Sequence, residues 1–198
     1  MSSIRDFEEA LRMIEKHLDF ARLVYRSLPF VFWAGVIPLL YIAASFMPGT
    51  GKQTALGLGI SVGLTLWFLL EENTAYKALE RLDTVLGRET KSPRLYMVSQ
   101  IFSWVTGAII AYISMKLGLP EPAWPLVFFG MGMGLFMVVD KVFRGTYDKE
   151  MIIACALPLL SLPIMQRSPL PGEDFTVMIV SSSLALTGLL YLRRAFRR

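Results

Sequence analysis

The sequence predicts an all-α membrane protein: one bundle of six transmembrane helices preceded by an amphipathic helix. Hydrophobic residues make up 54% of the 198 residues and the mean hydropathy is +0.51, both high for a soluble domain. The apolar residues gather in long blocks between short charged segments, rather than following the period of a half-buried helix or strand. We therefore treat residues 1–198 as a single integral membrane domain.

Residues 1–27 are predicted to form a charged cytoplasmic helix. Their apolar residues alternate at spacings of three and four, the heptad pattern of helices that pair with other helices. Leu11, Ile14 and Leu18 lie at the centre of this pattern. We expect these three side chains to belong to an assembly seam.

Six apolar blocks follow, at residues 28–47, 54–70, 95–117, 124–143, 151–165 and 175–192. A helix needs ~20 residues, at ~1.5 Å per residue, to cross ~30 Å of hydrocarbon. By this measure the block at 54–70 is marginal and the block at 151–165 is short. The latter contains Pro158 and Pro163, so a broken or re-entrant segment is the alternative to a continuous span there.

Basic residues set the expected topology, because Lys and Arg are retained on the cytoplasmic side. A cytoplasmic N-terminus leaves only Lys52, Lys116 and Arg167 of the 20 basic residues outside. A re-entrant fifth segment would place the basic tail at 193–198 outside, against this bias. The charge pattern thus favours six spans of the cell membrane with both termini in the cytoplasm. We expect the arginines of the tail, Arg193 to Arg198, to contact anionic lipid.

Residues 71–94 are expected to be a cytoplasmic helix and loop. Leu79, Leu82 and Leu86 again follow heptad spacing. Because the first two spans would form a hairpin, this helix and the N-terminal helix would leave the membrane on the same face. They can pair with each other, or present their seams to a partner protein or to a second copy of the chain.

Small residues at four-residue spacing predict close packing of membrane helices. Gly59 and Gly63 have this spacing in the second block, and Gly130 and Gly134 have it in the fourth. We expect these glycines to lie at contacts between helices.

A few polar residues within the apolar blocks outline a candidate path for a solute. They are Asp140, Gln100 and Ser161, the last of which lies between Pro158 and Pro163. Each also has a simpler structural interpretation. Asp140 can pair with a basic residue at the membrane surface, Gln100 can link two helices, and prolines occur in ordinary kinked membrane helices.

The sequence contains few residues of the types that catalyse reactions or bind metals and haem. With one cysteine (Cys155) and one histidine (His17), it can form no internal disulfide and lacks the ligands of haem and most zinc sites. Acidic residues alternate with the basic ones in the cytoplasmic segments, which argues against nucleic-acid binding. We expect no cofactor and no catalysis. The sequence favours a membrane component that assembles through its heptad helices, and a small transporter or channel is the alternative.

Overall fold

The computed structural model describes residues 2–46, 93–145 and 148–197, together with residues 58–59, 62–63, 66, 77, 81 and 84–85. The elements it describes are α1 (Ser2–Ser45), α4 (Pro93–Lys116), the short 3₁₀ helix η2 (Glu121–Ala123), α5 (Trp124–Arg144), α6 (Met151–Met165) and α7 (Gly172–Phe196). Within these residues all regular structure is helical. Four helices, α1, α4, α5 and α7, are long and apolar enough to cross a membrane, which indicates a membrane protein.

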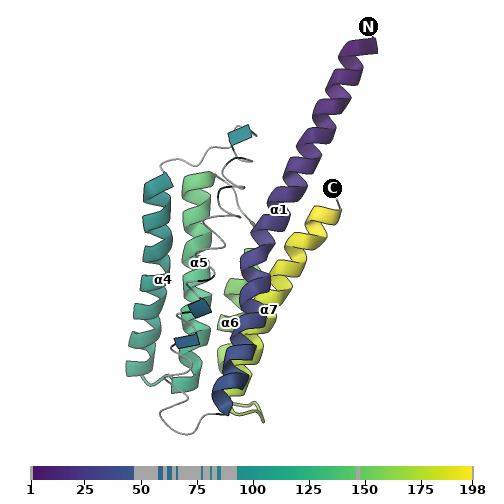
Figure 1. Ribbon diagram of the computed structural model, residues 1–198. Coiled ribbons are helices and arrows are strands. Elements are labelled where there is room, and N and C mark those ends of the chain that lie inside the picture. The colour runs from purple at the N-terminus through teal and green to yellow at the C-terminus, as the bar shows by residue number, and fades with distance from the viewer. Residues whose placement is uncertain are drawn as a thin grey trace.

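Helix α1 joins two segments that the sequence analysis had separated. It runs without a break over 44 residues, past the expected boundary at Leu28 and through Pro29 and Pro38. At ~1.5 Å per residue it is about 66 Å long, roughly twice the thickness of a bilayer's hydrocarbon. Its N-terminal part therefore extends beyond the other helices, as Figure 1 shows, and we call residues 2–19 the projecting half of α1. Residues 6–17 are all exposed.

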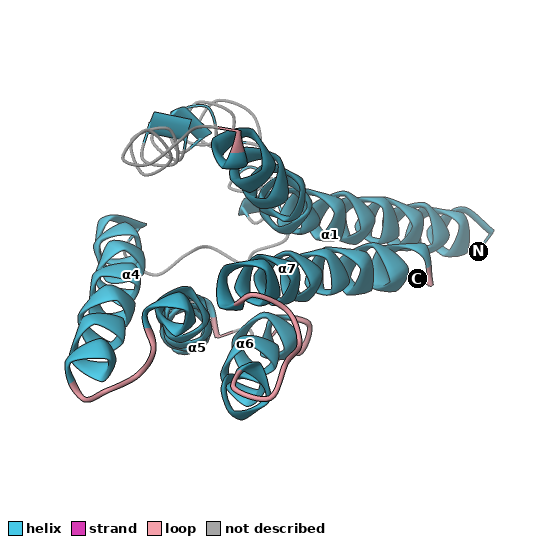
Figure 2. Ribbon diagram, turned by 90° about the horizontal axis from the view of Figure 1, so that it is seen from below, coloured by secondary structure: helices cyan, strands magenta, loops and turns pink. Residues whose placement is uncertain are grey.

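The helices pack in an order that places both termini at one end, which we call the terminal end (Figure 1). Helix α7 packs antiparallel along α1, and α6 packs against both α7 and α5. Helix α4 lies outermost and packs chiefly against α5 (Figure 2). Here two glycines allow a close approach, because a Cβ added to Gly107 would lie 3.0 Å from the backbone N of Gly132 and the O of Phe128.

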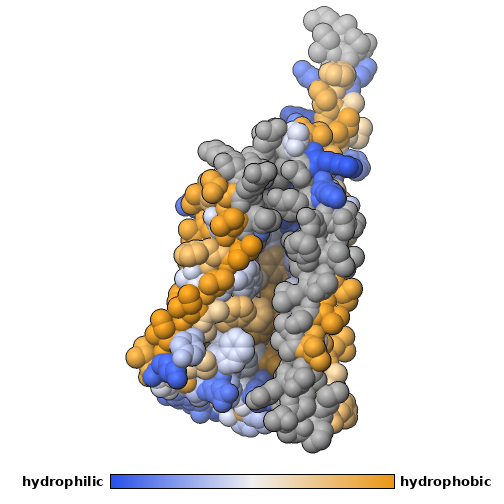
Figure 3. Space-filling model, turned by 60° about the vertical axis from the view of Figure 1, so that its left-hand side comes forward, coloured by the Kyte–Doolittle hydropathy of each residue, from blue (hydrophilic) through white to orange (hydrophobic). Residues whose placement is uncertain are grey.

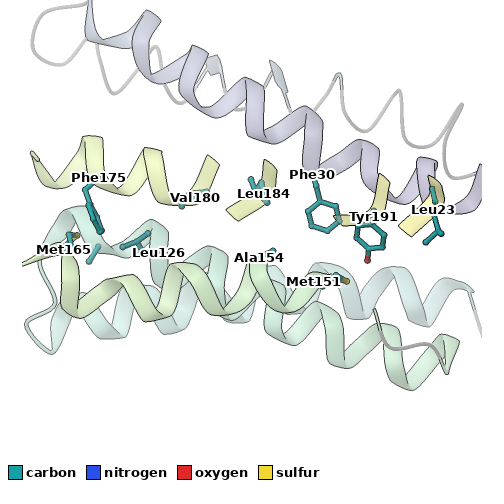
Figure 4. Close-up of a cluster of buried hydrophobic side chains, with 12 residues drawn as sticks. Leu23, Phe30, Leu126, Met151, Ala154, Met165, Phe175, Val180, Leu184 and Tyr191 are labelled. Carbon is teal, nitrogen blue, oxygen red and sulfur yellow. The ribbon is translucent and has the colours of Figure 1, made fainter. Parts of the chain in front are cut away.

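Helix α6 is continuous through both of its prolines, Pro158 and Pro163. Its first residue, Met151, lies near Tyr191 at the terminal end, and its last, Met165, lies beside Phe175 at the opposite end (Figure 4). The break that the two prolines had suggested is therefore not found. The helix runs from one end of the bundle to the other, although it has only 15 residues.

The core lies along α7, where this helix packs against α1, α5 and α6. Phe30 of α1 stacks on Tyr191 of α7 with ring centroids 5.6 Å apart, and Leu184 packs in the same cluster. Thr187 is completely buried, and its hydroxyl donates to the carbonyl of Ser183 one turn earlier. The hydroxyl of Ser183 likewise donates to the carbonyl of Val180, so these two hydroxyls bond to their own helix rather than to a neighbouring one.

Candidate functional site

A buried group of charges lies near the terminal end, in the part of α1 that packs along α7. Its centre is Arg26 of α1, whose side chain is only 8% exposed. The guanidinium pairs with Asp140 of α5 at 3.5 Å and with Asp148, which precedes α6. The two carboxylates are 5% and 8% exposed, so three charged side chains are removed from water together.

The turn between α5 and α6 brings Asp148 into this position. Helix α5 ends at Arg144, and Gly145 follows with a left-handed φ of 65° while its N–H donates to the carbonyl of Lys141 at 3.0 Å. Glycine adopts this conformation without steric penalty. Helix α5 thus ends at this glycine, and Asp148 lies on the side of the bundle that α1 occupies, where it pairs with Arg26.

Helix α7 completes the group. The hydroxyl of Tyr191 donates to Asp148 Oδ2 at 3.0 Å, and Arg194 Nη1 lies 3.8 Å from Asp148 Oδ1. Arg194 also pairs with Glu150 at 3.2 Å. We call these six residues, Arg26, Asp140, Asp148, Glu150, Tyr191 and Arg194, the ionic cluster. It connects α1, α5, the start of α6 and α7.

The ionic cluster has the properties of a structural link. Buried ion pairs contribute little net stability compared with apolar packing, but removing one partner leaves a costly unpaired charge. Arg26 faces two carboxylates at once, so it is the residue on which the neutralisation of the cluster most depends. The arrangement fixes the angle and depth at which α1 enters the bundle.

A second link joins α1 to α7 at the opposite end. The hydroxyl of Tyr41 donates to Asp174 at 2.7 Å and to Glu173 at 3.2 Å. Thr176 of α7 donates to the carbonyl of Pro122 at 2.6 Å, which ties α7 to η2. Polar contacts therefore hold α1 and α7 together near both ends of their common length.

The residues of the candidate path do not gather in one place. Asp140 belongs to the ionic cluster, whereas Gln100 is half-buried on α4. Ser161 is buried at the middle of α6, and its hydroxyl donates to the carbonyl of Pro158 at 2.7 Å. Pro158 is buried and Pro163 is exposed, so the two prolines lie on different faces of α6. The path therefore stays a hypothesis.

The seam residues of α1 lie mostly on the projecting half. Leu11 is 46% exposed and Ile14 is 54% exposed, while Leu18 is half-buried where the helix approaches the bundle. Figure 3 shows apolar side chains on this projecting half beside hydrophilic ones. The other half of the predicted seam, Leu79, Leu82 and Leu86, lies outside the described residues.

The four glycines lie against neighbouring helices. A Cβ on Gly59 would meet Leu40 of α1, and one on Gly63 would lie 3.4 Å from Trp33. A Cβ on Gly130 would crowd Leu159 of α6, and one on Gly134 would lie 3.0 Å from Cys155 Sγ.

The arginines of the tail have unequal surroundings. Arg194 is held by Glu150 and Asp148, whereas Arg193 and Arg197 are exposed. Arg198 lies outside the described residues. Within the described part of the tail, Arg193 and Arg197 are thus exposed, and their contact with anionic lipid stays a prediction.

Sequence reasoning selected Asp140 but missed its partners. Arg26 was counted only as a topology signal, and Arg194 was selected only as one of the arginines expected to contact anionic lipid. Asp148, Glu150 and Tyr191 were not selected. One signal was available: Arg26 interrupts the side of α1 that carries Leu23 and Phe30, and a charge on an apolar side calls for a buried partner.

Among the described residues, no three histidine, cysteine, aspartate or glutamate side chains are grouped to hold a metal ion. The chain matches no protein-family model, no curated protein and no solved structure at a significant level. Function therefore has to be inferred from the fold, the projecting half of α1 and the ionic cluster.

Proposed function

We propose that this chain is a non-enzymatic membrane component that assembles with itself or with another protein through the projecting half of α1. In this proposal the chain crosses the cell membrane six times, with both termini in the cytoplasm. The positive-inside distribution of Lys and Arg supports the orientation. The end-to-end course of α6 supports counting it as a span.

The observation that carries the proposal is the exposed apolar face of the projecting half. Phe7 is 64% exposed, Ile14 54% and Leu11 46%. From Arg26 to Ile14 is about 18 Å along the helix and to Phe7 about 29 Å, at ~1.5 Å per residue. In the proposed topology Arg26 lies near the membrane surface, so these side chains lie beyond the bilayer's hydrocarbon. Apolar side chains repeated at heptad spacing in water are typical of a helix that pairs with another helix.

The ionic cluster gives this projecting half a fixed base. Arg26 lies near the start of the part of α1 that packs along α7, and it pairs with Asp140, one turn before the end of α5, and with Asp148, which precedes α6. A helix held in this way presents its seam at a defined height and direction. A movement of α1 caused by a partner at the seam would then also displace α5, α6 and α7, because the ionic cluster links these helices to α1.

The test replaces Leu11, Ile14 and Leu18 together with asparagine and compares assembly by native mass spectrometry of protein extracted gently from its own membranes. We expect the unaltered chain to carry a second copy or a second polypeptide in a fixed ratio, and the triple variant to lose it. A control variant, Glu9→Gln with Lys16→Gln, changes exposed positions on the other side of the helix and should assemble normally. A monomeric unaltered chain, or a triple variant that still assembles, contradicts the proposal.

A small transporter or channel is the second candidate, and the burial of Asp140 favours it. Acidic residues buried in membrane bundles often couple ion movement to structural change. Flux measured in proteoliposomes should then fall in Asp140→Asn. Flux equal to that of the unaltered chain would remove Asp140 from such a mechanism.

A further inference from the structure

The heptad pattern of α1 does not stop at the membrane. Continuing the spacing of three and four from Tyr25 and Leu28 leads to four further positions in the part of α1 expected to lie in the bilayer, and to a fifth directly after the helix ends at Ser45. They are Phe32, Gly35, Leu39, Ile42 and Phe46. Most are strongly exposed: Leu39 is 67% exposed, Ile42 55% and Phe46 85%. One stripe thus follows almost the whole of α1, and we call it the long seam.

Gly35 lies in the membrane part of the long seam and is fully open. A Cβ added there would meet nothing within 4 Å. Glycine at such a position lets a second membrane helix approach closely. The two prolines, Pro29 and Pro38, fall beside the long seam rather than on it, so neither interrupts its surface.

The two halves of the long seam limit what can cover it. Lipid can cover the membrane half but not the half in water, and a soluble partner can cover only the half in water. A single occupant of both must cross the membrane in the same direction as α1 and project beyond it as a helix. A second copy of this chain has both properties, because copies inserted with one orientation present parallel α1 helices.

We infer that two copies of this chain pair through their α1 helices, in parallel, along the long seam. This inference rests on the proposed function and specifies its partner. An unbroken seven-residue repeat keeps both stripes in contact if the two helices coil around each other with a left-handed twist.

The charges beside the seam fit a parallel pair. In parallel helices, Glu15 of one copy faces the neighbourhood of Ala10 in the other, and Glu8 faces that of Ser3, so no two acids oppose each other. An antiparallel pair would instead bring Glu8 of one copy near Glu15 of the other. Like charges at this distance are destabilising.

The experiment is disulfide cross-linking in native membranes, in the full chain with Cys155→Ala as the background. A parallel pair places each inner seam residue next to the same residue of its partner, within the reach of a disulfide. After mild oxidation we expect dimers of Ile14→Cys, on the projecting half, and of Ile42→Cys, on the membrane half. Glu9→Cys, on the outer side of the same helix, should remain monomeric.

A second pair of variants tests the membrane half without cysteines. Gly35→Leu adds bulk where the single chain has open space, so the fold should survive while the dimer fraction falls at least several-fold. Ala108→Leu adds the same bulk at an exposed position of α4 and should leave the dimer fraction unchanged.

The outcomes separate this inference from the function it rests on. No dimer at Ile14→Cys and Ile42→Cys, with a different polypeptide bound through Leu11 and Ile14, overturns the pairing of two copies but keeps assembly. Dimers at Ile14→Cys alone overturn the long seam. A strictly monomeric chain overturns both.

Discussion

Replacing Arg26 with methionine is the sharpest test of the ionic cluster. Methionine keeps much of the length and the helix propensity of arginine, so the change removes mainly the charge. Arg26 pairs with Asp140 at 3.5 Å and also with Asp148, and all three side chains are at most 8% exposed. The variant leaves two buried carboxylates without their main cation.

The expected loss follows from this burial. Two opposite charges about 4 Å apart attract by roughly 4 kcal/mol at the effective dielectric constant of ~20 that suits protein sites. Measured losses on removing one partner of a buried pair are about 3–5 kcal/mol. We therefore expect Arg26→Met to lower the free energy of unfolding by about 3–5 kcal/mol, a large part of the stability of an ordinary domain.

Equilibrium unfolding in detergent or lipid micelles, followed by loss of helical circular dichroism, measures this loss. Arg194→Met is the matched control, because Arg194 is 38% exposed and solvent screens its pairs, so its loss should be about 1 kcal/mol or less. Adding Asp148→Asn to Arg26→Met should recover part of the stability, since asparagine carries no charge and still accepts the hydrogen bond from Tyr191. A loss below ~1 kcal/mol in Arg26→Met would refute the view that this cluster anchors α1.

Two further substitutions test the packing. Gly107→Ala should lower the free energy of unfolding by about 1–3 kcal/mol in the same experiment, because it crowds the contact of α4 with α5. The added Cβ would lie 3.0 Å from backbone atoms of Gly132 and Phe128, which cannot rotate away. A stabilised variant would show that α4 can shift without penalty. Thr187→Val should change the free energy of unfolding by less than ~1 kcal/mol, because the hydroxyl donates to the carbonyl of Ser183 within its own helix. A large loss would mean that this hydroxyl has a partner on another helix.

The sequence predicted helices well where long apolar blocks are bounded by charges. The block at 124–143 became α5, and the block at 151–165 became α6 with the same limits. It predicted the first helix less well, since the change from charged to apolar residues near Leu28 was interpreted as a boundary between two helices. Hydropathy indicates where the surroundings of a helix change from water to hydrocarbon, but it does not indicate where the helix ends. The helical backbone of α1 continues past Leu28 without a break.

The ionic cluster was harder to predict because its members are far apart in the sequence. Arg26 and Asp148 are separated by several helices, and their meeting depends on the turn at Gly145 and on α7 packing along α1. The periodicity of apolar residues predicts which side of a single helix is buried, but it does not predict which residues of two different helices will form an ion pair. The same limit applies to Tyr41 and Asp174, which meet only because α1 and α7 are antiparallel.

The shortness of α6 has a consequence for the surrounding bilayer. Its 15 residues extend about 22 Å, compared with ~30 Å of hydrocarbon, and Glu150 and Arg167 follow closely at its two ends. Ile152, Leu160 and Ile164 are exposed along it, so in the proposed six-span arrangement lipid would meet this helix directly. We expect lipids beside α6 to compress or bend so that their headgroups reach its charged ends. Hydrophobic mismatch of this kind would make the chain prefer thin membranes, and would create a local thin region on one side of the bundle only.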